Sequence, residues 1–306
     1  MKTVVALPSN PEPAPPSADT RRSGLEIFLE LVKSRLTALV LITTLVGFQM
    51  GVGSEPENYF TLIACMLGTA LCAAGAAALN ELWERDADSK MLRTKSRPLP
   101  AGELQPMRAL WIGLVLSIGG VVLLGATVNS AATALAAATI LLYVLIYTPL
   151  KKISTINTLV GAIPGALPPM IGYVAASGRF DVVAGILFAI LFLWQIPHFL
   201  AISWMYKEDY IRGGFVMLSG RDSTGFAVAS RSFIYTLALV GVTLLPNILG
   251  INNLWFAVGS VILGVAFAWH AWRFLQKRDI PSARALFFAS ITYLPLLLGL
   301  MVFTRK

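Results

Sequence analysis

The fold is decided by residues 60–88, FTLIACMLGTALCAAGAAALNELWERDAD, where an apolar run from Phe60 to Leu79 leads directly into a cluster of acids. About 20 apolar residues are enough to cross a bilayer. The run therefore predicts a membrane helix whose acidic end emerges at or just below the bilayer surface. Ionised groups are costly at that depth and are usually functional.

The rest of the chain has the composition of a polytopic membrane protein. Of its 306 residues 56% are hydrophobic and 13% are charged, against a charged share of about 25% in soluble domains. Nine stretches are long and apolar enough to span a bilayer: about 34–53, 59–82, 107–127, 130–149, 156–177, 180–205, 230–250, 253–273 and 284–303. We predict an all-α fold of nine transmembrane helices around a central chamber, covering residues 25–306. The proline-rich residues 1–24 predict a disordered cytoplasmic tail.

Lysine and arginine are distributed unevenly between the segments that join these spans. With a cytoplasmic N-terminus, the basic segments 85–108 and 207–231 fall on the cytoplasmic side, and the opposite side keeps only Arg179, Arg305 and Lys306. This asymmetry satisfies the positive-inside rule. It predicts a cytoplasmic N-terminus, a C-terminus on the opposite side and a functional face toward the cytoplasm, and it explains the net charge of +8 without a nucleic-acid partner.

The acids at the end of the second span have the spacing of one helix face. Asn80, Glu84 and Asp88 recur at i, i+4 and i+8. Clustered carboxylate and amide oxygens suit Mg²⁺, which commonly joins one or two carboxylates to substrate phosphates. Arg93 and Arg97 follow, and guanidinium groups bind phosphate bidentately. The pattern favours a Mg²⁺-diphosphate site, and the alternative is a solvated segment whose charges neutralise one another.

A second polar cluster lies at the end of the sixth span. Gln195-Ile196-Pro197 predicts a break in that helix, beside a cavity or a polar partner. The neighbouring His198 is a candidate base, cation or iron ligand, with a hydrogen-bonded structural histidine as the alternative. Tyr206-Lys207-Glu208-Asp209-Tyr210 leaves the span. His270 is predicted to be interfacial and to have no role.

Between these clusters, Lys151 and Lys152 close the fourth span and Asn157 opens the fifth. The two lysines are either topology signals or phosphate ligands. Glycines and prolines from Gly161 to Pro169 predict a thin, kinked fifth helix that widens the bundle into a pocket.

Asn80-Glu81-x-x-Glu84-x-x-x-Asp88 resembles the first aspartate-rich motif of the intramembrane aromatic prenyltransferase superfamily. Four blocks together resemble its haem-farnesylating branch: Glu84-Arg85-Asp86-x-Asp88-x-x-Met91-x-Arg93-Thr94-x-x-Arg97-Pro98, Tyr147-Thr148-Pro149-Leu150-Lys151, Trp194-Gln195-x-Pro197-His198-Phe199 and Ala283-Arg284-x-Leu286-Phe287-x-x-Ser290-Ile291-x-Tyr293-Leu294. The resemblance spans roughly residues 25–303. Two departures occur: Tyr206 and Tyr210 stand where the superfamily's second motif commonly has aspartates, with Lys207 as a substitute charge, and Glu81 stands where many relatives have aspartate.

The resemblance implies transfer of a farnesyl group from farnesyl diphosphate to a vinyl group of haem B, with addition of water, in a bacterial inner membrane. It further implies Mg²⁺ as cofactor and a haem A synthase or terminal oxidase as candidate assembly partner. The predicted metal ligands are Asn80, Glu84 and Asp88, which are also catalytic together with Lys207. The predicted substrate-binding residues are Glu81, Arg93, Arg97, Lys151, Asn157, His198, Tyr206, Asp209 and Tyr210.

Two alternatives differ in chemistry. A sister prenyltransferase acting on a quinone precursor such as 4-hydroxybenzoate keeps the metal site and changes the acceptor pocket. The second alternative is a transporter with broken helices. Against it, the nine predicted spans show no obvious inverted repeat, and the acids are predicted to lie at one face of the membrane.

Overall fold

The computed structural model describes residues 22–53 and 58–306. Most of the predicted disordered tail therefore lies outside the described residues. At the C-terminal end of the predicted tail, the first helix begins at Gly24. Ser23 caps this helix through a reciprocal capping box with Glu26. The ordered domain thus starts slightly earlier than predicted.

Within the described residues nine helices are long and apolar enough to cross a membrane, as predicted. They are α2 (Ser34–Gly51), α3 (Tyr59–Asp88), α4 (Pro106–Thr127), α5 (Ser130–Leu141) continued by η2 (Leu142–Tyr147) and α6 (Thr148–Leu150), α7 (Asn157–Ser177), α8 (Val182–Met205), α11 (Phe226–Val242) followed by α12 (Leu245–Ile248), α13 (Leu254–Lys277) and α14 (Ile280–Phe303). Three short helices precede or join them: α1 (Gly24–Leu31), α9 (Lys207–Arg212) and α10 (Leu218–Arg221).

Helix α4 illustrates how the sequence divides each span between lipid and protein. Its outward stripe, Trp111, Val115, Ile118 and Val122, recurs every three or four residues and is exposed, as a face that contacts lipid should be. Its other face packs against α3 through small residues. A Cβ on Gly75 of α3 would lie 2.3 Å from Ser117 Oγ, so only glycine permits this approach.

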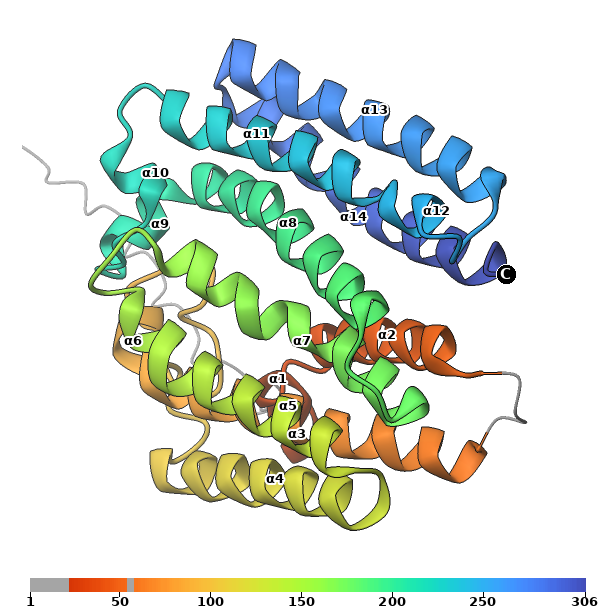
Figure 1. Ribbon diagram of the computed structural model, residues 1–306. Helices are drawn as coiled ribbons and strands as arrows, with labels where there is room; N and C mark the ends of the chain where they lie inside the picture. Colours follow the sequence, from red (N-terminus) through yellow and green to blue (C-terminus); the bar gives the residue numbers. More distant parts are fainter. Residues whose placement is uncertain (1–21, 54–57) are drawn as a thin grey trace, which may run out of the picture.

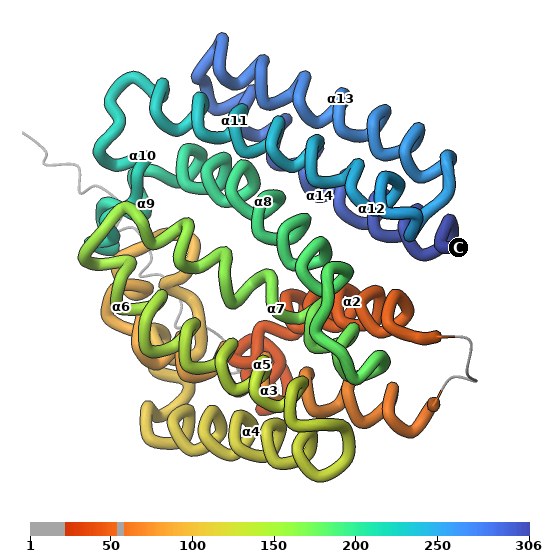
Figure 2. Tube along the Cα trace, viewed as in Figure 1, coloured from red at the N-terminus to blue at the C-terminus, as the bar shows by residue number. Residues whose placement is uncertain are grey.

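The helices form two groups joined at α7 and α8 (Figures 1 and 2). Helices α3, α4 and α5 lie on one side, and α11, α13 and α14 lie on the other. Helix α7 packs against α2, α5 and α8, while α8 packs against α11 and α14. Most residues of α7 are buried, which fits its central place.

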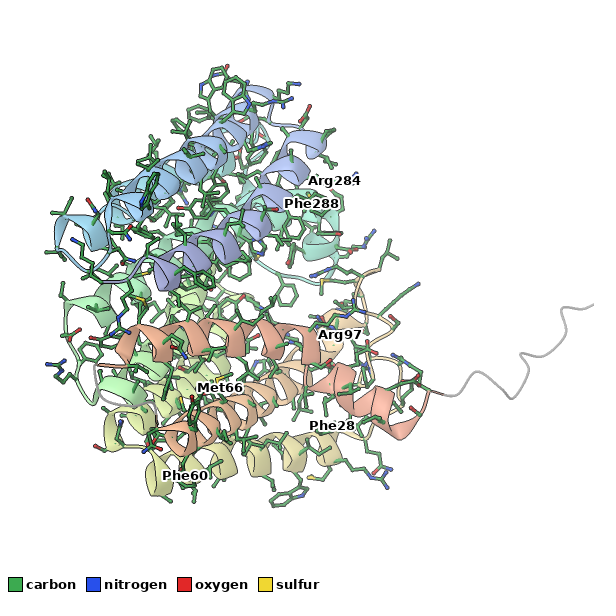
Figure 3. The ribbon with its side chains drawn as sticks, turned by 90° about the vertical axis from the view of Figure 1, so that its right-hand side faces the viewer. Phe28, Phe60, Met66, Arg97, Arg284 and Phe288 are labelled. Atoms are coloured by element: carbon green, nitrogen blue, oxygen red, sulfur yellow. The ribbon has the colours of Figure 1, made fainter. Side chains whose placement is uncertain are left out.

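The basic segments gather at one end of the bundle. One backbone hydrogen bond joins the α6–α7 loop to Val216, whose N–H donates to Lys151 O at 2.7 Å. Gly225 lies close to Arg278. Figure 3 places Arg97 and Arg284 at this end and Phe60 at the other. At the opposite end Arg305 donates to the carbonyls of Gln49 and Val52. The chain thus ends away from the basic segments, and the orientation of the two ends in a membrane stays a prediction.

Two spans differ from their prediction in ways that matter for the site. Helix α3 continues to Asp88, so the whole acidic cluster is helical. Helix α8 runs through Pro197 without a break; the predicted interruption there was wrong. Gln195 Nε2 donates to Leu191 O of the same helix and to Ala162 O of α7, which fixes α8 against its neighbour.

Candidate active site

The acidic end of α3 is buried inside the basic end of the bundle. Asn80, Glu81, Glu84 and Asp88 are each at most 4% exposed. A 30-residue helix is about 45 Å long at 1.5 Å per residue, whereas the hydrocarbon core is about 30 Å thick. The helix is therefore longer than the hydrocarbon core is thick, and protein surrounds the acidic side chains of its last turns.

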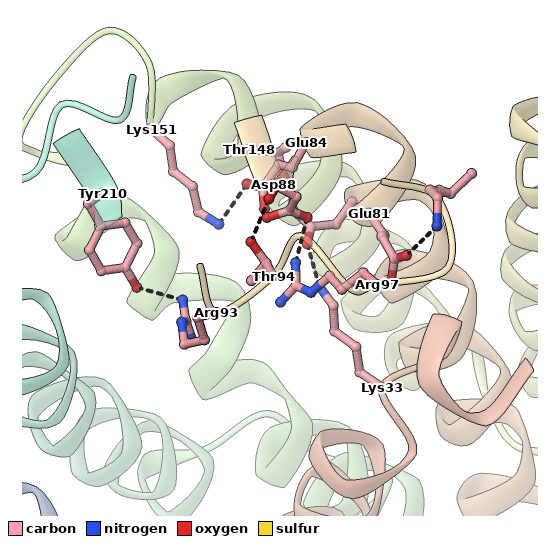
Figure 4. Close-up of polar contacts among 12 residues, drawn as sticks. Lys33, Glu81, Glu84, Asp88, Arg93, Thr94, Arg97, Thr148, Lys151 and Tyr210 are labelled. Atoms are coloured by element: carbon pink, nitrogen blue, oxygen red, sulfur yellow. Dashed lines mark hydrogen bonds and ion pairs between the residues drawn. The ribbon is translucent and has the colours of Figure 1, made fainter. Parts of the chain in front are cut away.

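Each of the three predicted metal ligands contacts a different cation, and Figure 4 shows Glu84 beside Lys151 and Asp88 beside Arg97. Glu84 Oε1 lies 2.7 Å from Lys151 Nζ, and Asp88 Oδ2 lies 2.6 Å from Arg97 Nη1. Asn80 Oδ1 accepts from Lys33 Nζ at 2.5 Å. Buried charges require such partners, and these three cations are also the kind of groups that bind phosphate.

Lys33 is a site residue that was not among the predicted ones. It joins α1 to α2 with φ at +48°, in the left-handed region that a lysine rarely adopts. Burial, and then the charge of Arg97, lower the pKa of Lys33 to about 8. The signal in the sequence was a lysine immediately before an apolar span, and its partner Asn80 is 47 residues away.

A π-helical turn at the end of the fourth span brings two groups to α3. Over η2 the chain is wound more widely, and Thr148 Oγ1 donates to Tyr143 O five residues earlier. Asn80 Nδ2 in turn donates to Thr148 Oγ1 at 3.0 Å. Burial lowers the pKa of Lys151, but the charge of Glu84 outweighs it and holds that pKa above its usual value. Such π turns are frequent at functional sites.

Two buried carboxylate oxygens have no hydrogen-bond partner in the described part of the chain. They are Asp88 Oδ1 and Glu81 Oε2. Glu81 Oε1 accepts from Leu99 N at 3.3 Å, which ties α3 to the loop before α4. Residues 22–53 and 58–306 contain no cluster of three Asp, Glu, His or Cys side chains able to hold a metal alone. Free carboxylate oxygens next to phosphate-binding cations fit Mg²⁺ that is completed by substrate phosphates.

Arg93 lines a small cavity together with Lys151, the partner of Glu84. Its guanidinium lies 5.2 Å from the centroid of the Tyr206 ring and 5.7 Å from that of Tyr210, within cation–π range. The cavity, of about 140 Å³, is lined by Arg93, Lys151, Tyr210 and the apolar Phe199 and Ile202, among others. The two tyrosines at the second motif thus hold an arginine, and the cavity combines positive charge with an apolar wall.

The remaining predicted residues lie around the cavity or further away. Asp209 accepts hydrogen bonds from Leu92 N, Arg93 N and Arg212, so its carboxylate orders the loop that carries Arg93. Burial raises the pKa of Asp209, but the hydrogen bonds from Arg212 and the two amides outweigh burial and lower it.

Lys207 and Asn157 are engaged with the backbone. Lys207 Nζ donates to Asp222 O at 2.9 Å and lies over the Trp204 ring, so the structure does not bring it to the acids of α3. Asn157 donates to Ser154 O and Val216 O while it lines the cavity. His198 lies between α8 and α14, where it contacts Ser290.

Comparison with known proteins gives this geometry its context. The profile of the UbiA prenyltransferase family matches residues 40–292. The chain belongs to the UbiA prenyltransferase family. The protoheme IX farnesyltransferase of Solibacter usitatus is 42% identical to it over 287 residues, which cover 91% of this chain and 98% of that protein.

Two solved structures share the fold of this UbiA family member. A structure described as digeranylgeranylglyceryl phosphate synthase superposes with a TM-score of 0.77 at 19% identity, over 92% of this chain and 98% of the other. A UbiA homologue from Archaeoglobus fulgidus, bound to GPP and Mg²⁺, superposes with a TM-score of 0.66 at 13% identity, over 90% and 99% of the two chains. The predicted all-α, nine-span architecture is confirmed.

Proposed function

We propose that the protein transfers a farnesyl group from farnesyl diphosphate to a vinyl group of haem B, with addition of water, to give haem O and diphosphate. The assignment of haem B as the acceptor rests on the 42% identity to a protoheme IX farnesyltransferase over 98% of that relative. The assignment of a diphosphate as the donor is supported by the buried cluster of acids and cations at the end of α3. The 4-hydroxybenzoate alternative has no comparable support.

Asn80, Glu84 and Asp88 are the residues that would hold Mg²⁺, as the sequence predicts. The orphaned oxygen of Asp88 and the hard oxygen donors around it support this assignment. A bound Mg²⁺ would neutralise charge on the diphosphate. Its presence in a UbiA homologue together with GPP adds support.

The protein's own cations have a further part in this proposal. Lys151 and Arg97 each neutralise a carboxylate in the cluster, and Lys33 donates a hydrogen bond to the amide oxygen of Asn80. When a diphosphate and its metal enter, these side chains can turn to phosphate oxygens, and Arg93 adds a further cation from the cavity that Lys151 also lines. Preorganised cations stabilise the charge that develops on the leaving diphosphate as its C–O bond breaks. The electron pair of that bond leaves with the diphosphate.

The apolar wall formed by Phe199 and Ile202 would keep water from the allylic cation until the vinyl carbon attacks C1 of the farnesyl group. Water then adds to the new cation and loses a proton, which completes the hydroxyethylfarnesyl substituent. We further propose that the protein works in a bacterial inner membrane with the basic end toward the cytoplasm, and that a haem A synthase or terminal oxidase receives its product.

The test is to supply membranes that contain the protein with haem B, farnesyl diphosphate and Mg²⁺, and to measure farnesylated haem by mass spectrometry and diphosphate release in parallel. We expect both products in the presence of Mg²⁺ and neither after chelation. Diphosphate release without any farnesylated haem would refute the acceptor, and transfer to 4-hydroxybenzoate instead would support the sister enzyme.

A further inference from the structure

The imidazole of His198 is clamped between two aromatic rings. Its ring stacks on Trp194 of α8 at a centroid distance of 4.8 Å and on Phe287 of α14 at 5.0 Å, with interplanar angles of 20° and 27°. Phe199 contacts it edge-on at 5.5 Å. Rings that cover the imidazole in this way leave mainly its edges available for polar contacts.

Ser290 occupies one of those edges and determines the tautomer of His198. Ser290 Oγ lies 2.6 Å from Phe287 O and 2.7 Å from His198 Nδ1. A hydroxyl has one proton to donate and a carbonyl can only accept, so the proton of Ser290 goes to Phe287 O. Ser290 Oγ must therefore accept from His198 Nδ1–H. The hydrogen-bond network assigns the proton to Nδ1 and leaves a lone pair on Nε2.

The second ring nitrogen of His198, Nε2, has no hydrogen-bond partner among the described residues. It is not among the fully buried polar atoms of residues 22–53 and 58–306. Ile202 follows His198 by one helical turn on α8 and lines the cavity that also contains Arg93 and Lys151. His198 itself, whose ring contacts α14 through Ser290 and Phe287, therefore lies within one helical turn of the proposed diphosphate site.

We propose that His198 Nε2 is the axial ligand of the haem iron and that Ser290 is the residue that positions it; this inference rests on the proposed function. Neutral imidazole with one free nitrogen is the commonest metal ligand in proteins. Ligating histidines almost always donate the other ring N–H to a fixed acceptor, which sets ring orientation and basicity, and Ser290 supplies that acceptor.

Iron ligation has a consequence for the reaction. It fixes the porphyrin at its centre and leaves the periphery, where the vinyl groups are, free to reach the cavity that Ile202 lines. The aromatic rings of Trp194 and Phe287 restrict rotation of the imidazole, so the plane of the porphyrin is fixed relative to α8. Orientation of this kind is a main source of rate enhancement in two-substrate reactions.

The chain offers a clean test because it contains only two histidines, His198 and His270. Purified full-length protein is titrated with haem B in detergent or nanodiscs, without farnesyl diphosphate, and the absorption and resonance Raman spectra are recorded. We expect a histidine-ligated spectrum that is unchanged in His270→Ala. His198→Ala should lose that spectrum, and imidazole added to His198→Gly should restore it.

Ser290→Ala tests the positioning role. Loss of a partner of this kind typically weakens metal affinity by about 10- to 100-fold, and we expect in addition a lower iron–histidine stretching frequency, which a merely structural defect would not produce. Unchanged haem affinity and spectrum in His198→Ala would overturn the inference, as would ligation lost in His270→Ala. Because no farnesyl donor is present, an enzyme that binds haem through His198 but forms no farnesylated haem would refute the proposed function alone.

Discussion

Neutralising Asp88 should separate the catalytic role of the acidic cluster from its role in stability. Asp88→Asn keeps the size of the side chain and removes the charge that faces Arg97 at 2.6 Å. The Asp88 side chain is 1% exposed and that of Arg97 is 22% exposed. The change therefore leaves a largely buried guanidinium without its counter-charge.

The magnitude follows from this burial. Removal of one partner of a buried ion pair costs about 3–5 kcal/mol in stability, and we expect the lower end because water reaches part of Arg97. For catalysis, loss of one preorganised electrostatic contact lowers the turnover rate by about 100- to 1,000-fold. Adding Arg97→Gln removes the orphaned charge and should recover most of the stability, because replacing both members of a buried pair is often neutral. Activity should stay low.

The assay measures thermal unfolding in detergent and the rate of diphosphate release per folded enzyme. Asp86→Asn is the matched control, because Asp86 lies on the same helix, undergoes the same chemical change, and has a side chain that is 78% exposed. Turnover in Asp88→Asn within a few-fold of wild type would refute the reasoning, as would an equal loss in Asp86→Asn.

Three further changes should have distinct effects. Lys33→Met should raise the KM for farnesyl diphosphate by about tenfold or more, the loss of one charged hydrogen bond, and leave the affinity for haem B unchanged in a binding titration; a reduced haem affinity alone would contradict this. Gly75→Ala should destabilise the protein by about 1–3 kcal/mol through overpacking, whereas Gly119→Ala, with nothing within 4 Å of its added Cβ, should not; equal melting temperatures would show that α3 and α4 are not in tight contact. Because the folded pKa of Asp209 lies below its ordinary value of 3.8, its stabilisation is complete above pH 3.8 and is lost as the pH falls through the folded pKa; Asp209→Asn should weaken that acid-induced loss in thermal unfolding, and an unchanged pH profile would contradict the assignment.

The sequence predicts the architecture because bilayer thickness sets the length of each apolar stretch. All nine predicted spans correspond to helices in the described residues. The i, i+4, i+8 spacing of Asn80, Glu84 and Asp88 predicts that they share one helix face; that this face is buried in protein comes from the tertiary structure. The alternative of charges that neutralise one another is partly realised as well, since Glu84 and Asp88 each pair with a cation.

The contacts that complete the site depend on tertiary structure and could not be predicted from spacing. Lys33 reaches Asn80 across 47 residues, and the π-helical turn that aims Thr148 has no composition signal of its own. Pro197 suggested a helix break because proline disrupts helical hydrogen bonds locally. The sequence pattern does not show that α8 packs against α7, α11 and α14, and α8 runs through Pro197 in the structure. The contact of Tyr206 and Tyr210 with Arg93 likewise joins parts of the chain that are more than 100 residues apart, which local spacing does not predict.

The central claim is the choice of acceptor, and a competition assay tests it most directly. Purified protein is given isotopically labelled farnesyl diphosphate and Mg²⁺ with haem B and 4-hydroxybenzoate at equal concentration, and mass spectrometry follows the label. We predict that the label appears in a hydroxyethylfarnesyl haem and that Asp88→Asn abolishes it. Label in the phenolic acid, or label released only as free farnesol while haem B is bound, would contradict the account.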